Sequence, residues 1–340
     1  MVQLGKSYYN SILSATFSPC GEYFVAGNVF GDIRLFNFQN LLCNTEEISD
    51  NDTKISKNRF NFNTSFEKPI SYLSSSDKFC IAGIDGEILG WPWTDVIGLE
   101  NGNTIPAPSW KIRLPQSGEN SSMKTDLNCI KIETGVDCVL YVGCSNNNIY
   151  AFSLEDGRLL RTYSGHTDFV HCLNIRENTL ISGGEDGTIR MWDCRSKEII
   201  NVVKPYTNSS VTRPELGNWI GDASLNEDWM VCGGGVRLSL WNLRNMDSPM
   251  TVFNNTKDRG IHIAQFYQDR ILAGGCSSCF SVLSYNDELH TGIETSSNPV
   301  YSCNISTPKD TNKILCLTGS SNKIDISTNF NYREFVIPFY

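Results

Sequence analysis

Ser182, His166 and Asp186 are the residues of this 340-residue sequence whose types come closest to a catalytic set. In many hydrolases a serine, a histidine and an aspartate form a triad in which the histidine activates the serine hydroxyl. However, Ser182 lies inside the apolar run "LISGGEDGTIRMW", and the sequence contains no Gly-x-Ser-x-Gly turn that would expose a nucleophile. The sequence therefore does not favour a hydrolase, and these three residues need another explanation.

Other patterns that could bind a metal or a phosphate are incomplete. Cys276 and Cys279 have the spacing of a zinc-binding pair, but no second pair or histidine follows at ligand distance. The three glycines at 233–235 precede a strand-like run rather than a helix, so they do not predict a phosphate-binding loop. No His-Glu-x-x-His, phosphate-loop or dinucleotide-binding motif occurs. We therefore expect no catalytic residue, no metal ion, no cofactor and no enzymatic activity.

Charge and composition restrict the class of partner. The chain carries 37 acidic against 28 basic residues, a formal net charge of −9, which argues against broad binding of phosphate backbones. No apolar run is long enough to span a membrane, and the N-terminus does not resemble a secretory signal. Most of the 13 cysteines lie in apolar runs, so we expect reduced core residues of a cytosolic or nuclear protein.

A repeated hairpin indicates the elements that hold these residues. An apolar residue, one further residue and a glycine recur seven times, each time followed by a short polar turn and a second apolar strand. The glycines are at positions 27, 83, 143, 183, 233, 274 and 319. An upstream strand precedes most of these hairpins, and connecting segments supply a fourth strand. Seven four-stranded units without long amphipathic helices predict an all-β, seven-bladed β-propeller.

We expect one domain that spans residues 1–340. The predicted blades lie near residues 12–66, 69–113, 126–163, 168–204, 219–254, 260–294 and 298–339. The chain ends in "YREFVIPFY", a run too apolar for a free tail. We therefore expect this C-terminal run to form the outer strand of the seventh blade and to close the ring near the first.

The segment "SGHTDFVHCLNIRENTLISGGEDGTIRMWD" resembles a WD repeat, with Gly165-His166 and Trp192-Asp193 as the signature dipeptides. This resemblance implies a buried network that links the histidine, a strand serine, the turn aspartate and the tryptophan. In this sequence those residues are His166, Ser182, Asp186 and Trp192. The four side chains are therefore interpreted as scaffolding that locks the fourth blade, and not as a reactive site.

A narrower resemblance covers nearly the whole chain. The stretches "DWMVCGGG" and "VTRPELGNWIG" are similar to the family of THO complex subunit 6, the WD-repeat subunit of the THO/TREX messenger-RNA export machinery, and "FYQDRIL" and "NFNYREF" agree with it. Segments 39–66 and 94–125 depart from the family pattern. The resemblance implies a nuclear, non-catalytic scaffold that binds coiled-coil THO subunits, promotes assembly, and couples transcription, mRNA processing and splicing to mRNA export. RNA contact would be indirect or weak.

Three long connections are candidates for recognition, because binding residues concentrate in long loops on a rigid scaffold. They comprise residues 39–58, residues 94–108 with 115–125, and residues 205–218. Arg213 lies in the last connection and Trp219 follows it, and both residue types are enriched at interface hot spots. Both are candidate partner-binding residues, with burial of Trp219 in the blade core as the alternative.

A second hypothesis rests on the residues Trp192 to Arg195. They resemble the Trp-Asp-x-Arg motif by which substrate receptors of cullin-RING ubiquitin ligases meet their adaptor, and "WNLR", ending at Arg244, is a weaker echo. Arg195 and Arg244 are therefore further candidate partner-binding residues. The alternatives are that the chain is such a receptor, with a ligase adaptor as its partner, or that Arg195 is a solvated charge at a blade edge.

Overall fold

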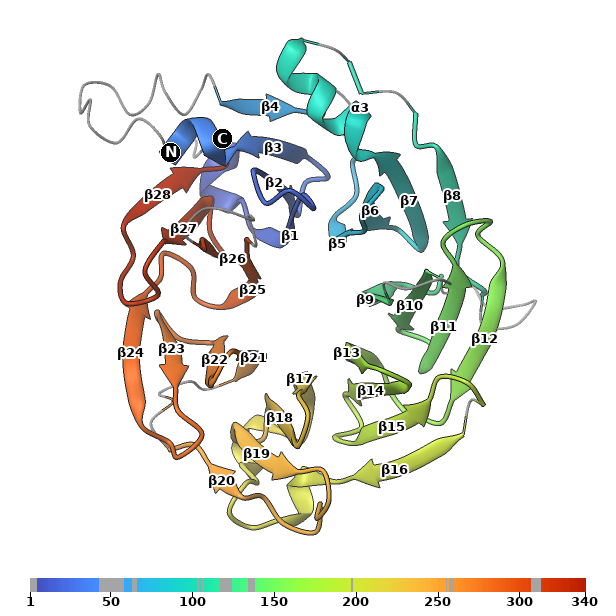
Figure 1. The fold of residues 1–340 in the computed structure, drawn as a ribbon, viewed down its shortest axis with the longest axis vertical. Helices are drawn as coiled ribbons and strands as arrows, with labels where there is room; N and C mark the ends of the chain where they lie inside the picture. Colours follow the sequence, from blue (N-terminus) through green and yellow to red (C-terminus); the bar gives the residue numbers. More distant parts are fainter. Residues whose placement is uncertain are drawn as a thin grey trace. The chain divides into compact units, whose positions relative to one another are not determined.

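The structure is a computed structural model. It describes residues 5–42, 58–62, 66–102, 104–105, 107–116, 124–133, 138–196, 198–254, 256, 260–306 and 313–340. Within these ranges the strands form seven four-stranded antiparallel sheets, each built from consecutive strands (Figure 1). This confirms the predicted fold class, an all-β, seven-bladed β-propeller.

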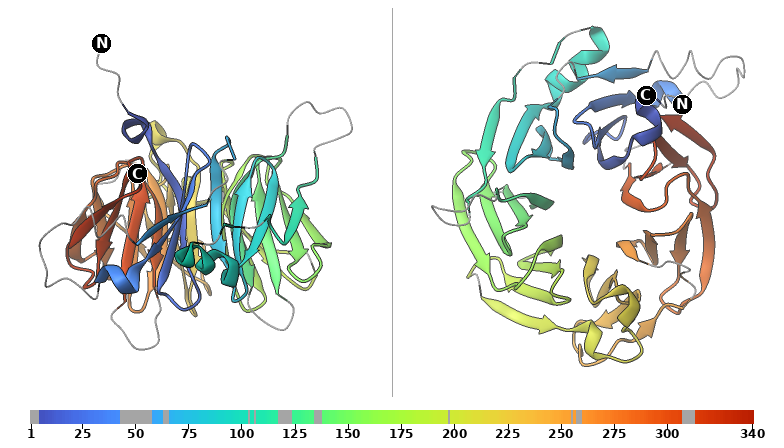
Figure 2. Two further views of the ribbon diagram at one scale, coloured as in Figure 1. Left: turned by 90° about the horizontal axis from the view of Figure 1, so that it is seen from above. Right: turned by 180° about the vertical axis from the view of Figure 1, so that it is seen from behind.

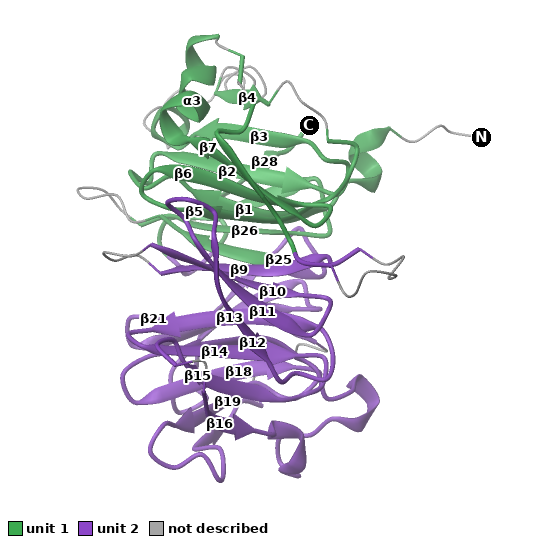
Figure 3. Cartoon of the chain, turned by 90° about the vertical axis from the view of Figure 1, so that its right-hand side faces the viewer, with its two compact units in different colours: residues 1–114, 302–329, 333–340 green, residues 115–301, 330–332 purple. Residues whose placement is uncertain are grey.

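The chain divides into two compact units, which comprise residues 1–114, 302–329 and 333–340, and residues 115–301 and 330–332 (Figure 3). The first unit contains the sheet of β1 (Ile12–Phe17), β2 (Tyr23–Asn28), β3 (Ile33–Asn37) and β4 (Arg59–Asn61). It also contains the sheet of β5 (Ile70–Ser75), β6 (Phe79–Ile84), β7 (Glu87–Pro92) and β8 (Trp110–Arg113). Its third sheet is β25 (Val300–Ile305), β26 (Leu315–Gly319), β27 (Lys323–Ser327) and β28 (Phe335–Pro338), of which the first two residues of β25 are assigned to the second unit.

The second unit contains four sheets. They are β9 (Leu127–Glu133), β10 (Val139–Cys144), β11 (Asn148–Ser153) and β12 (Leu159–Ser164); β13 (Val170–Arg176), β14 (Thr179–Gly184), β15 (Ile189–Asp193) and β16 (Ile199–Val203); β17 (Ile220–Leu225), β18 (Trp229–Gly234), β19 (Ser239–Asn242) and β20 (Thr251–Val252); and β21 (Ile261–Tyr267), β22 (Arg270–Gly275), β23 (Cys279–Leu283) and β24 (Leu289–Glu294). Whether the two units form one domain, as predicted for residues 1–340, stays a prediction.

Burial falls from the second strand of each blade to the fourth. In the blade of β13 to β16, residues 180–184 of β14 are all buried, whereas the first three residues of β16 are exposed. The apolar runs that precede the repeated glycines therefore form the blade cores. A middle strand that is covered on both faces reads as a continuous apolar run, and an outer strand does not.

The C-terminal run forms β28, the outer strand of its sheet, and contacts the first blade, as predicted. Ile337 and Phe339 belong to a core cluster that includes Ile12 and Phe36 of the first blade. The Nη1 atom of Arg34 donates a 2.6 Å hydrogen bond to the carbonyl oxygen of Phe339. Apolar packing and hydrogen bonds therefore join the two ends of the chain within the first unit.

Short helices occupy parts of the long connections. They are α1 (Phe38–Leu42), α3 (Trp93–Ile97), η2 (Gly98–Asn101), η3 (Pro205–Thr207) and η4 (Pro214–Leu216), and a further short helix, η1 (Lys6–Tyr9), precedes β1. Helix α3 packs against β6 and β7, where Trp93 and Val96 are buried (Figure 2). Most of the predicted recognition loop 39–58 (residues 43–57) lies outside the described residues, as do residues 117–123 of the predicted segment 115–125. No helix in the described part of the chain has the length and apolar character needed to cross a membrane.

Candidate functional site

The structure brings His166, Ser182, Asp186 and Trp192 together in one blade. His166 precedes β13, Ser182 lies in β14, Asp186 lies in the turn after β14, and Trp192 lies in β15. His166 Nε2 is 2.8 Å from the Ser182 hydroxyl oxygen, and His166 Nδ1 is 2.9 Å from Asp186 Oδ2. Trp192 Nε1 donates a 2.9 Å hydrogen bond to the same Ser182 oxygen.

The turn that holds Asp186 depends on local hydrogen bonds. Asp186 Oδ1 accepts from the backbone N–H of Thr188 at 2.9 Å and from the Thr188 hydroxyl at 2.8 Å. Asp186 Oδ2 also accepts from the backbone N–H of Thr167 at 3.0 Å. Gly187 follows with a φ of +72°, which glycine adopts without strain. Thr188, two residues after the turn aspartate, is a member of the network that sequence reasoning did not identify, although its position was visible in the sequence.

The electrostatics of the turn favour an ionised aspartate. Burial alone would raise the pKa of Asp186. The hydrogen bonds from His166 and from the backbone N–H groups of Thr188 and Thr167 outweigh this effect, so the pKa of Asp186 lies well below the usual range. A carboxylate only accepts hydrogen bonds, so Nδ1 of His166 donates to Asp186, while Nε2 meets the Ser182 hydroxyl. In this arrangement every polar atom of the four side chains that faces the network has a partner.

This set lacks the access that a catalytic triad requires. Ser182 is fully buried in a middle strand, and its hydroxyl is bonded to both His166 and Trp192. A catalytic serine hydroxyl must be accessible to the carbonyl carbon of a substrate, and the buried Ser182 hydroxyl is not. The geometry therefore supports a structural network.

The two cysteines of the zinc-like pair have different neighbours. Cys276 Sγ is 3.5 Å from His262 Nε2, whereas Cys279 begins β23 and faces Gly292 of β24. Across the described residues, no three His, Cys, Asp or Glu side chains come together as a metal site would require. Cys80, Cys172, Cys232 and Cys316 are buried thiols outside any disulfide, and burial raises the pKa of Cys80 to about 12.

Arg213 and Trp219 are both partly buried, and both side chains donate hydrogen bonds to backbone carbonyl groups. The Arg213 guanidinium donates to the carbonyl oxygens of Gly234, Gly235 and Val236 at distances of 2.8–3.0 Å. Trp219 Nε1 donates a 2.9 Å hydrogen bond to the carbonyl of Leu216. Arg213 therefore holds the turn of the fifth blade in place, and partner binding by either residue stays a prediction.

Arg195 and Arg244 occupy equivalent places, directly after β15 and β19. The Arg195 side chain is 70% exposed and forms a two-bond pair with Asp193, at 2.9 and 2.7 Å. Arg244 is 86% exposed and lies 3.4 Å from Asp228. Pairing with Arg195 lowers the pKa of Asp193 to about 2. Both guanidinium groups are accessible to a protein partner.

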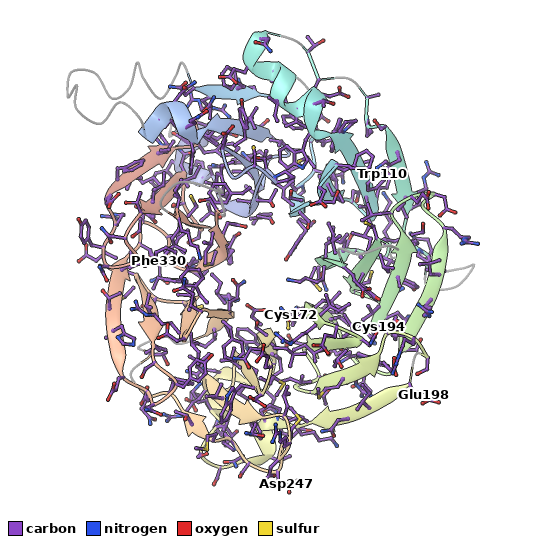
Figure 4. The ribbon with its side chains drawn as sticks, viewed as in Figure 1. Trp110, Cys172, Cys194, Glu198, Asp247 and Phe330 are labelled. Carbon is purple, nitrogen blue, oxygen red and sulfur yellow. The ribbon has the colours of Figure 1, made fainter. Side chains whose placement is uncertain are left out.

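The structure shows a row of exposed aliphatic side chains that sequence reasoning missed. They lie at or just before the first residues of β12, β16, β20 and β24, and between 42% and 69% of each is exposed: Leu159, Ile199, Ile200, Met250 and Leu289. We call this row the aliphatic edge. Glu198 and Asp247, at the outer margin of the same two blades as Ile199 and Met250, flank it (Figure 4). The shared position of these five residues at the beginning of the outer strands can be recognised only once the first residue of each strand is known.

Comparison with known proteins identifies the family. Residues 111–324, more than half of the chain, match the model of the family described as Nucleolar protein 10-like, N-terminal domain, so this part of the chain is a domain of that family. THO complex subunit 6 of Drosophila melanogaster is 32% identical over 98% of this chain and 91% of its own length. The chain belongs to the THO complex subunit 6 family.

Relatives from vertebrates agree with this assignment to the THO complex subunit 6 family. The homologue of Danio rerio is 32% identical over 97% of this chain and 97% of its own length. The human protein is 31% identical over 97% of this chain and 93% of its own length. Among solved structures, the computationally designed Ika8 protein matches 96% of this chain and 86% of its own at a TM-score of 0.60. At 14% identity that likeness concerns the fold alone.

Proposed function

We propose that the chain is a nuclear, non-catalytic subunit of a THO complex that binds other THO subunits and promotes their assembly. Family membership carries this proposal, because relatives that match nearly the whole chain are named THO complex subunit 6. Through that complex the chain would help to couple transcription, mRNA processing and splicing to mRNA export. The buried state of Ser182 supports a role without catalysis.

The aliphatic edge is the surface that best fits a subunit partner. An exposed row of large aliphatic side chains marks a protein interaction site more often than scattered apolar residues do. Its members come from four consecutive blades, and Arg195 lies at the same edge, because it follows β15 just before β16 begins. An amphipathic helix of a coiled-coil subunit would place its apolar face against Ile200 and Met250 and its basic side chains beside Glu198 and Asp247.

RNA contact by this chain alone is expected to be weak. A formal net charge of −9 leaves few basic residues to neutralise phosphates, so partners would supply most of the RNA contacts.

Affinity purification from nuclear extract tests the proposed function. We expect the tagged chain to co-purify with the other THO subunits after RNase treatment, as identified by mass spectrometry. Recovery without any THO subunit would contradict the proposal, and loss of the THO subunits on RNase treatment would contradict direct protein binding.

A second candidate function, substrate receptor of a cullin-RING ligase, is favoured by the exposure of Arg195 in its Trp-Asp-x-Arg motif. The Arg195→Ala variant separates the two functions. Loss of a β-propeller ligase adaptor with THO binding intact would support the receptor, whereas loss of THO subunits would place Arg195 in the THO interface.

A further inference from the structure

A second surface lies at the opposite edge of the blades from the aliphatic edge. In the blade of β13 to β16, Val170 at the start of β13 pairs with Gly184, and Ile189 pairs with Val203 at the end of β16. The start of the inner strand and the start of the outer strand are therefore at opposite ends of the sheet. Residues at the starts of β13, β17, β21 and β25 share this other edge.

Five aromatic and histidine side chains gather there: Phe169, His171, Trp219, His262 and Tyr301. We call them the aromatic surface. The rings of Trp219 and His262 are stacked, with centroids 5.3 Å apart and an interplanar angle of 27°. Tyr301 meets His262 edge-on at 5.7 Å. Phe169 is 46% exposed and Tyr301 is 38% exposed, so ring surface remains open to a ligand.

Acidic groups border the aromatic surface. Glu185 Oε2 is 2.7 Å from His171 Nε2, and the Glu185 side chain is exposed. Asp168 precedes Phe169 in the chain. Two arginines near this edge donate hydrogen bonds within the chain: Arg213, in the connection before β17, to three carbonyl oxygens, and Arg237, in the turn after β18, to Asn254. Glu185 therefore offers an exposed carboxylate beside the rings, whereas guanidinium N–H groups of Arg213 and Arg237 donate hydrogen bonds within the chain.

His262 contributes a ring rather than a positive charge. Burial lowers the pKa of His262, and the nearby His171 lowers it further. A neutral imidazole stacked on Trp219 extends the flat aromatic area without repelling a cation.

We propose that the aromatic surface binds an arginine side chain in a basic segment of a partner protein. A guanidinium group is planar, stacks on aromatic rings and forms paired hydrogen bonds with a carboxylate, which this surface supplies in Glu185. Phosphate groups would meet Asp168 and Glu185 with like charge, so a nucleic acid fits this surface less well. The proposal does not rest on THO membership, because it concerns an edge that the aliphatic residues do not share.

Binding of short labelled peptides, measured by fluorescence anisotropy on the full chain, tests the proposal. The probes are a Gly-Ser peptide with three arginines, the same peptide with three lysines, and an oligouridylate of similar length. We expect the arginine peptide to bind more tightly than the lysine peptide and the RNA. Tyr301→Ala and Phe169→Ala should each weaken arginine-peptide binding about two- to fivefold, the effect of one exposed cation–π contact. Glu185→Gln should weaken it as well.

Tyr332→Ala is the matched control, because Tyr332 is an exposed aromatic residue outside the aromatic surface. We expect this variant to bind like the unaltered chain, and a thermal melt of each variant shows that it is folded. The proposal is overturned by equal binding of the arginine and lysine peptides, by an equal effect of Tyr332→Ala, or by no detectable peptide binding. Preferential RNA binding that Tyr301→Ala or Phe169→Ala removes would overturn it in favour of a nucleic-acid site.

Discussion

The indole Nε1 of Trp192 donates a 2.9 Å hydrogen bond to the Ser182 hydroxyl, which also contacts His166 at 2.8 Å. The fifth blade contains a different tryptophan–serine bond, since Trp241 Nε1 donates a 2.9 Å hydrogen bond to Ser239 Oγ of its own strand, β19. In the fourth blade the serine lies on the neighbouring strand β14 and also meets the histidine, which joins the aspartate. The two serines, both fully buried, form a matched pair for experiment.

Ser182→Ala should destabilise the protein by about 1–3 kcal/mol, because it leaves His166 Nε2 and Trp192 Nε1 buried without this partner. Ser239→Ala is the control and should cost less, because it removes the partner of one ring nitrogen instead of two. Urea denaturation monitored by tryptophan fluorescence measures both effects. An equal or smaller loss for Ser182→Ala would show that the histidine and aspartate add no stability.

Removal of the residues after Asn331 should abolish the folded monomer. The truncation deletes β28 and exposes the core cluster to which Ile337, Phe339 and Ile12 belong. Size-exclusion chromatography should then show aggregates. A truncated chain that stays monomeric and melts at an unchanged temperature would refute a stabilising role of β28.

A milder change tests the same contact. Tyr340→Phe removes a hydroxyl that accepts a 2.7 Å hydrogen bond from Asn28 Nδ2 and donates to Asp32. We expect a loss of about 1 kcal/mol in the free energy of unfolding. Unchanged stability would show that water replaces the hydroxyl without cost.

Asp222 should make the protein less stable as pH rises. Burial raises the pKa of Asp222 to about 7, against the opposing effect of the backbone N–H groups of Ala264 and Ala223. An aspartate in the unfolded chain titrates near pH 4, so between about pH 4 and pH 7 the folded state binds more protons. The contribution of Asp222 to the free energy of unfolding therefore falls across that window, whereas the lowered pKa of His262 acts in the opposite direction below about pH 6.5. We expect the Asp222 contribution to decrease by about 1–3 kcal/mol between pH 5 and pH 8, because Asp222 is only partly buried by area.

Asp222→Asn should flatten this dependence, as measured by urea denaturation at pH 5 and pH 8. Asp186 does not mask the effect. Its lowered pKa contributes stability that is complete above about pH 4 and is lost only as pH falls below that value. Equal pH slopes for the variant and the unaltered chain would contradict the assignment to Asp222.

Much of the fold could be predicted from the sequence, because each blade repeats an apolar strand, a glycine and a polar turn. The network of His166 and Trp192 followed from the WD-repeat resemblance. Arg213 shows the limit: its residue type indicated an interface, yet its guanidinium binds three carbonyl oxygens of a turn some 20 residues away. Such contacts depend on how loops fold back onto a neighbouring blade, which local pattern does not encode.

The surfaces were harder to predict than the core. The aliphatic edge depends on the first residue of each outer strand, and boundaries are the least certain part of a sequence-based assignment. Asp222 was missed for another reason. Its Oδ2 accepts a 2.9 Å hydrogen bond from Ala264 N in the next blade. The spacing of these two residues in the sequence does not predict this contact.

The aliphatic edge provides the most direct test of the proposed function. RNase-treated purifications are compared quantitatively for the unaltered chain, for the double variant Ile200→Glu with Met250→Glu, and for the control Tyr332→Glu. All three changes are at exposed positions, so each protein should fold and melt normally. We predict at least a tenfold loss of co-purifying THO subunits for the double variant and no loss for the control. Undiminished recovery of THO subunits by a folded double variant would contradict binding through this edge.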